Sequence, residues 1–281
     1  MRIQLGGAVG FSTLLTVLVL LGFAGTAAAQ QYDLVNAQDG SGVFGYKDTP
    51  VQPWSGFHVH DPDRPVPKRV EPPPANGPEQ ASAAPSDAIV LFDGKDLAEW
   101  QPTRWQLEDG CLIATEGPLA TKQEFGDCQL HLEFQVPAEP DPNIWNRGNN
   151  GVMLLGEIEV QIFDSFDTKI YPDGQAAAIY AQTPPLVNAC RKPGEWQTYD
   201  ILFQAPRFDD QGKLTAPARL TMLHNGVLVH LNQEIYGHSP HAGLANYEKL
   251  KSPGPLAFGA HHCPVRFRNI WIRRLELDSE R

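Results

Sequence analysis

The chain has 281 residues, a formal net charge of −11 at pH 7 and a hydrophobic fraction of 42%. An acidic chain without a stripe of Lys and Arg cannot neutralise a row of phosphates, so the sequence argues against nucleic acid and anionic membrane surfaces as partners. The length is large for one domain, but the first third lacks the pattern of a folded core. The composition therefore indicates one folded domain preceded by other segments.

Residues 1–29 have the features of a secretory signal peptide. Arg2 precedes an apolar run from Gly10 to Ala24, and the segment ends in Ala27-Ala28-Ala29. The run is too short for a typical transmembrane helix, with an uncleaved anchor as the alternative. No Cys follows the cleavage site, which argues against a lipoprotein anchor. We therefore expect a periplasmic or extracellular protein with no membrane contact beyond this segment.

Residues 30–86 are rich in Pro, Gly, Asp and Ala and show no sustained period of 2 or 3.6 residues. Such a composition buries too little apolar area to offset the entropy lost on ordering. The segment is therefore predicted to be a linker or an extended arm without a core of its own.

One part of this arm, residues 45–65, is richer in aromatic and potentially functional side chains than the rest. It gathers aromatic rings, imidazoles and a carboxylate: Trp54, Phe57, His58, His60 and Asp61. The two histidines and the aspartate could ligate a metal. The preferred interpretation is that the aromatic side chains dock the arm onto the folded domain.

The four cysteines, at positions 111, 128, 190 and 263, show neither a C-x-x-C motif nor the spacing of a zinc site. An oxidising compartment permits disulfides between them. Cys111 with Cys128 is the favoured pair, because both fall in predicted short strands of the same early segment. Reduced structural cysteines are the alternative.

Residues 87–281 contain strand after strand, separated by turn signals. Residues 128–136 alternate apolar and polar side chains, and residues 195–205 and 264–277 repeat that period, the latter with a change of phase near Asn269 that suggests a bulge. Asn225-Gly226 suits the type I′ turn of a hairpin. About a dozen short strands predict an all-β fold, an antiparallel β-sandwich or jelly roll, with a concave face for an extended ligand.

The segment GEIEVQIFDS, residues 156–165, raises the question of what its polar side chains face. Residues two apart in a strand share a face, so this segment carries two rows. The apolar row is Ile158, Val160 and Ile162, and the polar row is Glu157, Glu159 and Gln161.

Several motifs in order resemble the 3-keto-disaccharide hydrolase family over residues 87–278. The motifs are LFDGKDLAEW (91–100), WQLEDGCLIATEG (105–117), RGNNGVML (147–154), EVQIFDS (159–165), AAIYAQ (177–182), RKPGEWQTYDI (191–201), LHNGVLV (223–229) and HHCPVRFRNIWIR (261–273). The resemblance implies a concanavalin A-like lectin/glucanase sandwich that cleaves glycosides already oxidised at carbon 3.

The resemblance also frames the chemistry of residues 159–164. Laminarinase-type glucanases of this fold class carry an E-x-D-x-x-E strand, whereas this chain has Glu159-x-Gln161-x-x-Asp164, for which the same face is expected. A retaining glycosidase needs two matched carboxyl groups. A ketone at carbon 3 removes that need, because it acidifies the hydrogen on carbon 2 and permits elimination followed by hydration.

This route needs a base, an acid and donors to an enolate oxygen. Glu159 or His261 is the candidate base, and Asp164 is the candidate acid or water-holding residue. Arg147 and Asn149 are candidate donors to the carbonyl oxygen. Further candidate substrate contacts are an amide and two aromatic rings: Gln161, Tyr180 and Trp145. Each of these side chains could instead have a purely structural role.

The expected function is a secreted hydrolase acting on a 3-keto-glycoside. A non-catalytic carbohydrate-binding sandwich is the alternative, because the fold serves lectins equally well, and a structural cell-surface module is a third possibility. The sequence identifies no certain cofactor, and a divalent cation could bind on the concave face through Glu159, Asp164 and a histidine.

Overall fold

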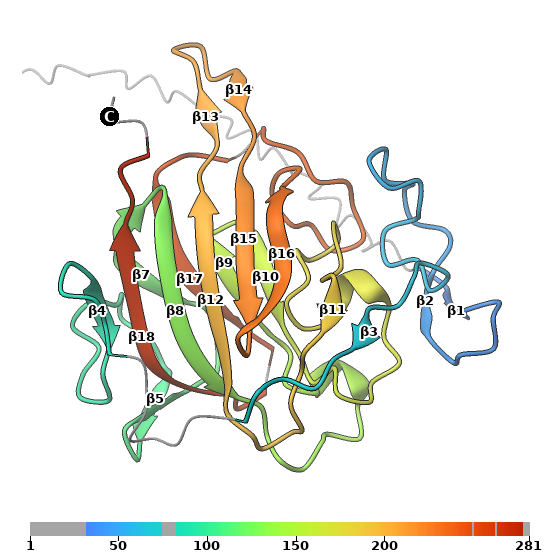
Figure 1. Cartoon of the computed structure of the whole chain (residues 1–281), viewed down its shortest axis with the longest axis horizontal. Coiled ribbons are helices and arrows are strands. Elements are labelled where there is room, and N and C mark those ends of the chain that lie inside the picture. The colour runs from blue at the N-terminus through green and yellow to red at the C-terminus, as the bar shows by residue number, and fades with distance from the viewer. Residues whose placement is uncertain (1–31, 75–82, 249, 262, 278–281) are drawn as a thin grey trace, which may run out of the picture. The chain divides into compact units, whose positions relative to one another are not determined.

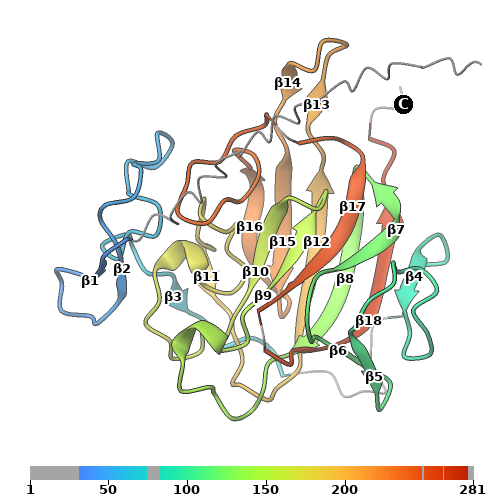
Figure 2. The same ribbon diagram turned by 180° about the vertical axis from the view of Figure 1, so that it is seen from behind.

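Two antiparallel sheets packed face to face form the body of the fold (Figures 1 and 2). The eight-stranded sheet has the order β16 (Val227–Glu234), β15 (Arg219–His224), β12 (Gln197–Gln204), β8 (Cys128–Gln135), β18 (Arg266–Arg274), β6 (Cys111–Ile113) and β5 (Gln106–Glu108), with β4 (Ile89–Phe92) also paired to β18. The four-stranded sheet has the order β10 (Ile158–Ile162), β9 (Asn150–Leu154), β17 (Gly254–Ala260) and β7 (Leu119–Phe125). The predicted all-β sandwich is confirmed.

The structure, a computed structural model, describes residues 32–74, 83–248, 250–261 and 263–277. The predicted signal peptide, residues 1–29, lies outside the described residues. Residues 32–281 form one compact unit, so the arm from residue 32 onward belongs to the same unit as the sandwich. Across these described ranges, no helix is both long and apolar enough to cross a membrane.

Shorter elements flank the two sheets. Pairs of short strands are β1 (Leu34–Asn36) with β2 (Phe44–Tyr46), β3 (Lys68–Arg69) with β11 (Val187–Asn188), and β13 (Arg207–Phe208) with β14 (Leu214–Ala216). Turns of 3₁₀ helix include η2 (Ile144–Asn146) and η3 (Pro172–Gly174). The β3–β11 pair is parallel and joins the arm to the sandwich.

The sandwich core, the apolar cluster between the two sheets, follows the predicted alternation. Leu130, Leu132 and Phe134 of β8 are fully buried, and so are the apolar residues of β10, namely Ile158, Val160 and Ile162. All six belong to one cluster that takes side chains from both sheets. Burying apolar area at about 25 cal/mol per Å² is the main stabilisation of such a layer.

The polar face of β8 is not left to solvent but forms a buried ionic network with β12 and β18. Nδ1 of His131 lies 2.6 Å from Oδ1 of Asp200, and Arg268 donates to Glu133 at 2.7 Å. Burial alone would lower the pKa of His131, but Asp200 and Glu133 outweigh it and raise the pKa to about 9. Asn269, at a φ of 47°, forms the predicted bulge in β18 and donates to Glu133.

The predicted hairpin joins β15 to β16. Asn225 and Gly226 have φ values of 54° and 78°, the left-handed conformation that a type I′ turn requires at both central residues. The side-chain amide of Asn225 also donates a hydrogen bond to the carbonyl of Ala189 at 2.8 Å. The turn therefore ties the hairpin to a neighbouring loop.

The favoured disulfide between Cys111 and Cys128 is wrong. All four cysteines are free and buried. Strand β18 lies between the two strands that carry this pair: Leu112, next to Cys111, pairs with Phe267, whereas Cys128 pairs with Arg274. Seven residues along a strand correspond to about 20 Å, far beyond the reach of a disulfide.

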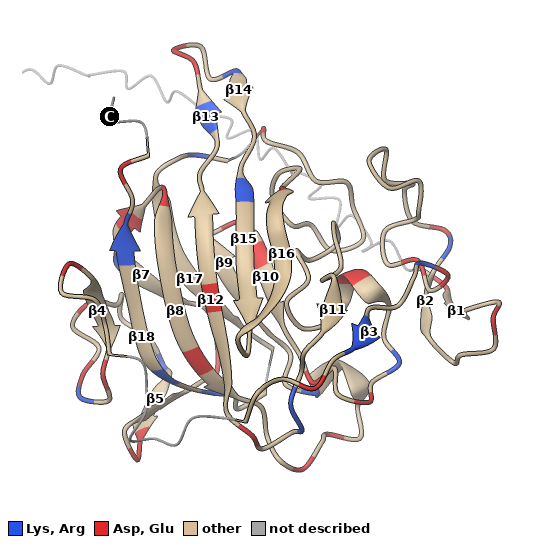
Figure 3. Ribbon diagram, viewed as in Figure 1, with Lys and Arg blue, Asp and Glu red and all other residues tan. Residues whose placement is uncertain are grey.

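The charges are dispersed rather than gathered on one element. Figure 3 shows Lys and Arg on strands and loops interleaved with Asp and Glu, without a continuous basic stripe in this view. Many of them are paired with one another, such as Arg219 with Glu234 at 3.0 Å. This arrangement gives no electrostatic argument for binding a polyanion.

Residues 32–74 dock on the sandwich through rings and buried polar groups. Trp54 stacks on Tyr236 with ring centroids 4.2 Å apart. Gln52 is fully buried and donates to the carbonyl of Ala181 at 2.7 Å. Arg64 donates to the carbonyl of Gln182 at 3.0 Å. Buried hydrogen bonds of this kind compensate the polar groups of a segment that has little apolar area of its own.

Candidate functional site

The polar row of β10 faces a cleft with a volume of about 400 Å³. The polar side chains that line the cleft are Asn149, Glu159, Gln161, Ser239, His241 and His261. The apolar and aromatic side chains that line it are Tyr46, Trp145, Phe163, Ile170, Tyr171 and Tyr180. The size and the mixture of rings with a few polar groups are typical of a site for a small molecule.

Strand β10 supplies Glu159 and Gln161 to the floor of this cleft, and β9 and β17 follow β10 in the sheet. Gln161 of β10 lies opposite Gly151 of β9, which lies opposite Gly259 of β17. A Cβ atom on Gly151 would lie 2.3 Å from Oε1 of Glu159, so the glycine leaves room for the carboxyl group to lean across the strand. The sequence folds in this way because Ile158, Val160 and Ile162 must point into the core.

Glu159 is the partly buried acid on this floor. Its backbone N–H donates to Oγ of Ser239 at 3.0 Å, which fixes the strand edge against the loop that carries His241. Burial raises the pKa of Glu159 to about 7. A carboxyl group that titrates near neutrality can both accept and donate a proton at physiological pH. Glu157, two residues earlier, is exposed and does not line the cleft.

Gln161 offers a free acceptor beside Glu159. The residue is 3% exposed, and its Oε1 atom has no hydrogen-bond partner within the part of the chain that the structure describes. A buried polar atom without a partner costs free energy unless water or a ligand satisfies it. The amide is therefore placed to accept a hydrogen bond from a ligand hydroxyl.

Tyr180 and His241 form a hydrogen-bonded pair on the cleft wall. Oη of Tyr180 lies 3.0 Å from Nδ1 of His241 and 3.5 Å from Oη of Tyr171. Partial burial of the imidazole lowers the pKa of His241, and so do the nearby imidazoles of His60 and His261, although the residue as a whole remains accessible to solvent. The neutral ring carries one proton, so a Tyr180 hydroxyl that donates to Nδ1 leaves that proton on Nε2.

A strained loop holds Tyr180 over Glu159. The backbone N–H of Tyr180 donates to the carbonyl of Glu159 at 3.0 Å. Ala177 and Ala181, on either side, have φ values of 65° and 60°, which are uncommon for residues with a Cβ. Such strain persists only where surrounding contacts over-determine it, and it is common at functional sites.

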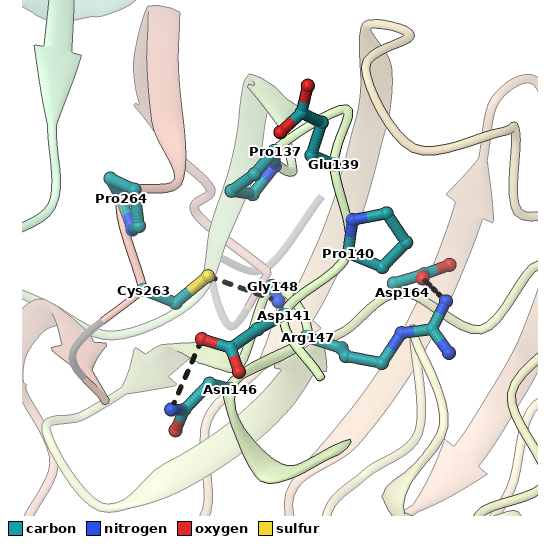
Figure 4. A pocket seen from close by; sticks show the side chains of 10 residues that line it. All are labelled: Pro137, Glu139, Pro140, Asp141, Asn146, Arg147, Gly148, Asp164, Cys263 and Pro264. Carbon is teal, nitrogen blue, oxygen red and sulfur yellow. Dashed lines mark hydrogen bonds and ion pairs between the residues drawn. The ribbon is translucent and has the colours of Figure 1, made fainter. Parts of the chain in front are cut away.

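Arg147 and Asp164 lie outside this cleft and bind each other. Figure 4 shows them in a second pocket of about 180 Å³, where Nη2 of Arg147 is 2.6 Å from Oδ2 of Asp164. β10 ends at Ile162 and pairs with β9 without a register shift, so an offset of three residues turns Asp164 away from Gln161. The expected shared face of Glu159, Gln161 and Asp164 is therefore not formed.

The metal sites considered from the sequence are not assembled. Among the described residues, no group of three or more His, Cys, Asp or Glu side chains could hold a metal ion. Asp164 is separated from Glu159 by its position in the second pocket. In the arm, Asp61 pairs with Lys47 at 2.7 Å and His60 faces Asp173, so the His-x-His-Asp motif does not converge on one point.

The cleft also contains residues that the sequence analysis missed. His241 and Ser239 come from a loop without periodicity, and Tyr171 precedes η3. Tyr46 comes from the arm, whose clustered aromatic residues were the one available signal. Six of the eight predicted site residues do meet in the cleft: Trp145, Asn149, Glu159, Gln161, Tyr180 and His261.

Comparisons with solved structures define the class of protein. A structure from Parabacteroides distasonis named "putative glycosyl hydrolase" is 39% identical, with a TM-score of 0.68, and the match covers 79% of this chain and 95% of that chain. A second structure of that name from the same organism is 17% identical, covers 68% and 94% of the two chains, and shows a similar fold with a TM-score of 0.50. Fold and site define a glycosyl hydrolase-like β-sandwich.

A family model narrows this class. The model of the 3-keto-alpha-glucoside-1,2-lyase-like domain matches residues 87–273, and the chain belongs to this family. The resemblance recognised in the sequence motifs is thereby confirmed. No curated protein sequence matches the chain. The matched residues begin after the arm, so Tyr46 lies outside the matched segment.

Proposed function

We propose that the chain is a secreted enzyme that cleaves the glycosidic bond of a neutral 3-keto-glycoside by elimination and hydration. The observation that carries the proposal is Glu159, a carboxyl group with a pKa of about 7 on the floor of a ring-lined cleft. The name of the family and the name of the Parabacteroides distasonis relative support a glycoside as substrate. Residues 1–29 support export.

The reaction starts with removal of the proton on carbon 2, which the ketone at carbon 3 acidifies. Glu159 in its ionised form accepts this proton, the bond from carbon 1 to the glycosidic oxygen breaks, and the aglycone oxygen takes a proton from an acid. Water then adds its hydroxyl to carbon 1, and carbon 2 regains a proton. The net change is hydrolysis, without an oxidant or a reductant.

Glu159, once it has accepted the proton from carbon 2, is the candidate acid for the aglycone oxygen. The neutral ring of His241 can donate a hydrogen bond from Nε2, and the contact between His241 and Tyr180 orients this ring on the cleft wall. Gln161 and Asn149 are placed to bind hydroxyl and carbonyl oxygens of the sugar. His261 lines the same cleft and remains the alternative base. Arg147 and Asp164 act in this proposal through their ion pair, which supports the segment between Trp145 and Asn149, rather than by contact with substrate.

The substrate is proposed to be uncharged. Among the described residues that line the cleft, none is Lys or Arg. A carboxylate, sulfate or phosphate on the sugar would therefore lose its hydration without a cationic partner. Trp145 and Tyr46 offer flat faces against which a pyranose ring can pack.

The second candidate function is sugar binding without catalysis. The observation that favours it is the wall of five aromatic rings, namely Tyr46, Trp145, Phe163, Tyr171 and Tyr180. Such a wall suits a lectin as well as an enzyme.

Incubation of the purified protein with a 3-keto-glucoside that carries a chromogenic aglycone, and with its unoxidised parent, tests the proposal. We expect release of the aglycone from the keto compound alone, at a rate that a chelator does not change. Binding of the keto sugar without release of the aglycone would refute catalysis and support the second candidate, a sugar-binding module. Equal release from both sugars would refute the elimination route.

A further inference from the structure

Asp173 contacts three side chains of the arm, namely Gln52, His60 and Arg64. This carboxylate is fully buried and accepts the backbone N–H of His60 at 3.0 Å, while Nδ1 of the same histidine lies 3.1 Å away. Nη1 of Arg64 lies 3.8 Å away. Burial alone would raise the pKa of Asp173, but His60 and Arg64 outweigh it and lower the pKa. The site thus keeps a buried negative charge, which Gln52, His60 and Arg64 of the arm stabilise.

The ring of His60 lies against four side chains that line the cleft. It stacks on Tyr171 with centroids 4.0 Å apart, and it lies 4.9 Å from Tyr180, 5.7 Å from His241 and 6.2 Å from Tyr46. His60 itself is fully buried and does not line the cleft. It is therefore in place to support the Tyr180–His241 pair without contact with a ligand.

Two features of His60 are costly for a residue that only fills space. Its φ of 60° is left-handed, and its Nε2 atom has no hydrogen-bond partner within the described ranges. Gly45 is required as a glycine beside it, because a Cβ there would lie 2.1 Å from the His60 carbonyl oxygen. An apolar ring would fill the same volume without an unsatisfied nitrogen, and buried polar groups retained at such a cost favour a functional role.

We propose that His60 and Asp173 are a positioning pair, which the arm completes and which fixes Tyr171, Tyr180 and His241 for hydrogen bonding to the substrate in the cleft. The inference rests on the proposed function and extends it to a segment outside the residues matched to the family. Asp173 holds the proton on Nδ1 of His60 and so fixes the orientation of the ring. The ring in turn fixes Tyr171 by stacking, and Tyr171 and Tyr180 approach through their hydroxyl groups.

Four variants of the full chain test the pair. His60→Asn tolerates the left-handed backbone and retains a donor near the Nδ1 position, but it removes the ring. Asp173→Asn retains the shape and removes the charge. His58→Asn is the matched control, two residues away. Trp54→Ala weakens docking of the arm through the stack on Tyr236 and leaves His60 intact.

Steady-state kinetics on the keto-glucoside are the first measurement. We expect His60→Asn and Asp173→Asn to lower kcat about 100-fold with little change in KM, as misplacement of a reacting group by about 1 Å does. His58→Asn should match the wild type, and Trp54→Ala should lose thermal stability more than kcat. Equal losses of kcat in Trp54→Ala and His60→Asn, or unchanged kcat in both pair variants, would overturn the proposal.

An NMR titration of the histidine rings decides the inference even if the wild type shows no turnover, an outcome that would refute the proposed function alone. The titratable groups that face His241 are Tyr180, His60 and His261. Loss of the His60 imidazole should raise the pKa of His241 in His60→Asn and leave it unchanged in His58→Asn. An unchanged His241 titration in His60→Asn would contradict the positioning role.

Discussion

Two hydrophobic clusters within the described part of the chain are built in opposite ways. The sandwich core takes regular strands from two sheets and is almost entirely aliphatic and aromatic. The arm–cleft cluster, which consists of Tyr46, Phe163, Ile170 and Tyr171 with partly buried rings around it, takes its side chains from a strand of the arm and from loops. Its neighbours include a buried carboxylate and a buried imidazole. The first cluster supplies stability, and the second supplies the site.

The difference explains why the proposed chemistry is assigned to the arm–cleft cluster. A regular apolar layer tolerates many sequences and provides no polar group for a ligand. The arm–cleft cluster needs particular residues, because each polar group must meet its partner in a region with little periodic structure. Variants in the two regions should therefore have separable effects on stability and on activity.

The largest effect is expected from removal of residues 1–85, which deletes the arm and leaves the sandwich core complete. No residue of the arm belongs to the sandwich core, so a chain that starts at Ser86 should still unfold cooperatively. Turnover of a keto-glycoside should fall below detection, because Tyr46 and the partners of Asp173 are lost. Calorimetry and aglycone release measure the two effects. Loss of the thermal transition would show that the arm belongs to the folding unit, and retained turnover would exclude it from the site.

Truncation of the sandwich core should have the converse effect. Leu132 is fully buried in β8, so Leu132→Ala should reduce the free energy of unfolding by about 2–5 kcal/mol. kcat, measured well below the melting temperature, should remain near that of the wild type. Leu231, which is 68% exposed, provides the control, because Leu231→Ala should change neither quantity appreciably. A large loss of kcat in the folded Leu132→Ala protein would show that the sandwich core and the arm–cleft cluster are coupled, contrary to our account.

A methyl group at Gly151 tests whether a small change beside Glu159 affects activity more than a similar change away from the cleft. Gly151→Ala places Cβ where the Glu159 carboxyl group lies, so the acid must move. We expect a loss of kcat of about 100-fold from this displacement. Gly126 is a useful control, since the nearest atoms to an added Cβ there are at 3.9 Å. Wild-type turnover in Gly151→Ala would show that the position of Glu159 is not critical.

The prediction with the smallest expected effect on turnover concerns the pH dependence of stability on the outer face of β8. The pKa of His131 is about 9 in the folded protein and about 6.5 in an unfolded chain. The charged ring therefore stabilises the fold fully below pH 6.5, and this contribution is lost as the pH rises through 9, at a cost of about 3 kcal/mol. Urea unfolding at pH 6 and pH 10 measures it.

His131→Gln should remove most of this pH dependence. The variant cannot carry the charge that Asp200 and Glu133 stabilise. Turnover at pH 7 should be unaffected, because the network lies on the face of the sheet opposite the core. A wild-type pH dependence in this variant would assign the effect to other groups.

Much of the fold could be predicted because it follows from local periodicity. The alternation in residues 128–136, the Asn225-Gly226 turn and the change of phase at Asn269 each have a short-range cause, and each is found in the structure. The pairing of Cys111 with Cys128 failed because it depended on strand order. Sequence proximity gave no sign that β18 lies between the two strands.

The site could be predicted only in part, for the same reason. Glu159 and Gln161 were found from the period of a strand, whereas Asp164 lies beyond the end of that strand, where the period no longer applies. His241 and His60 come from segments without periodicity, and their approach to Tyr180 depends on how the arm and the loops dock. No spacing within the sequence encodes that contact.

The pH dependence of kcat/KM in the wild type and in Glu159→Gln tests the central claim most directly. A base with a pKa of about 7 predicts a wild-type rate that rises with pH and levels off above neutrality. Glu159→Gln should lose about 100-fold to 10,000-fold in rate with an unchanged melting temperature. Glu157→Gln, the exposed control, should retain the wild-type profile. A Glu159→Gln enzyme with full turnover and the same profile would contradict the account and move the base to His261.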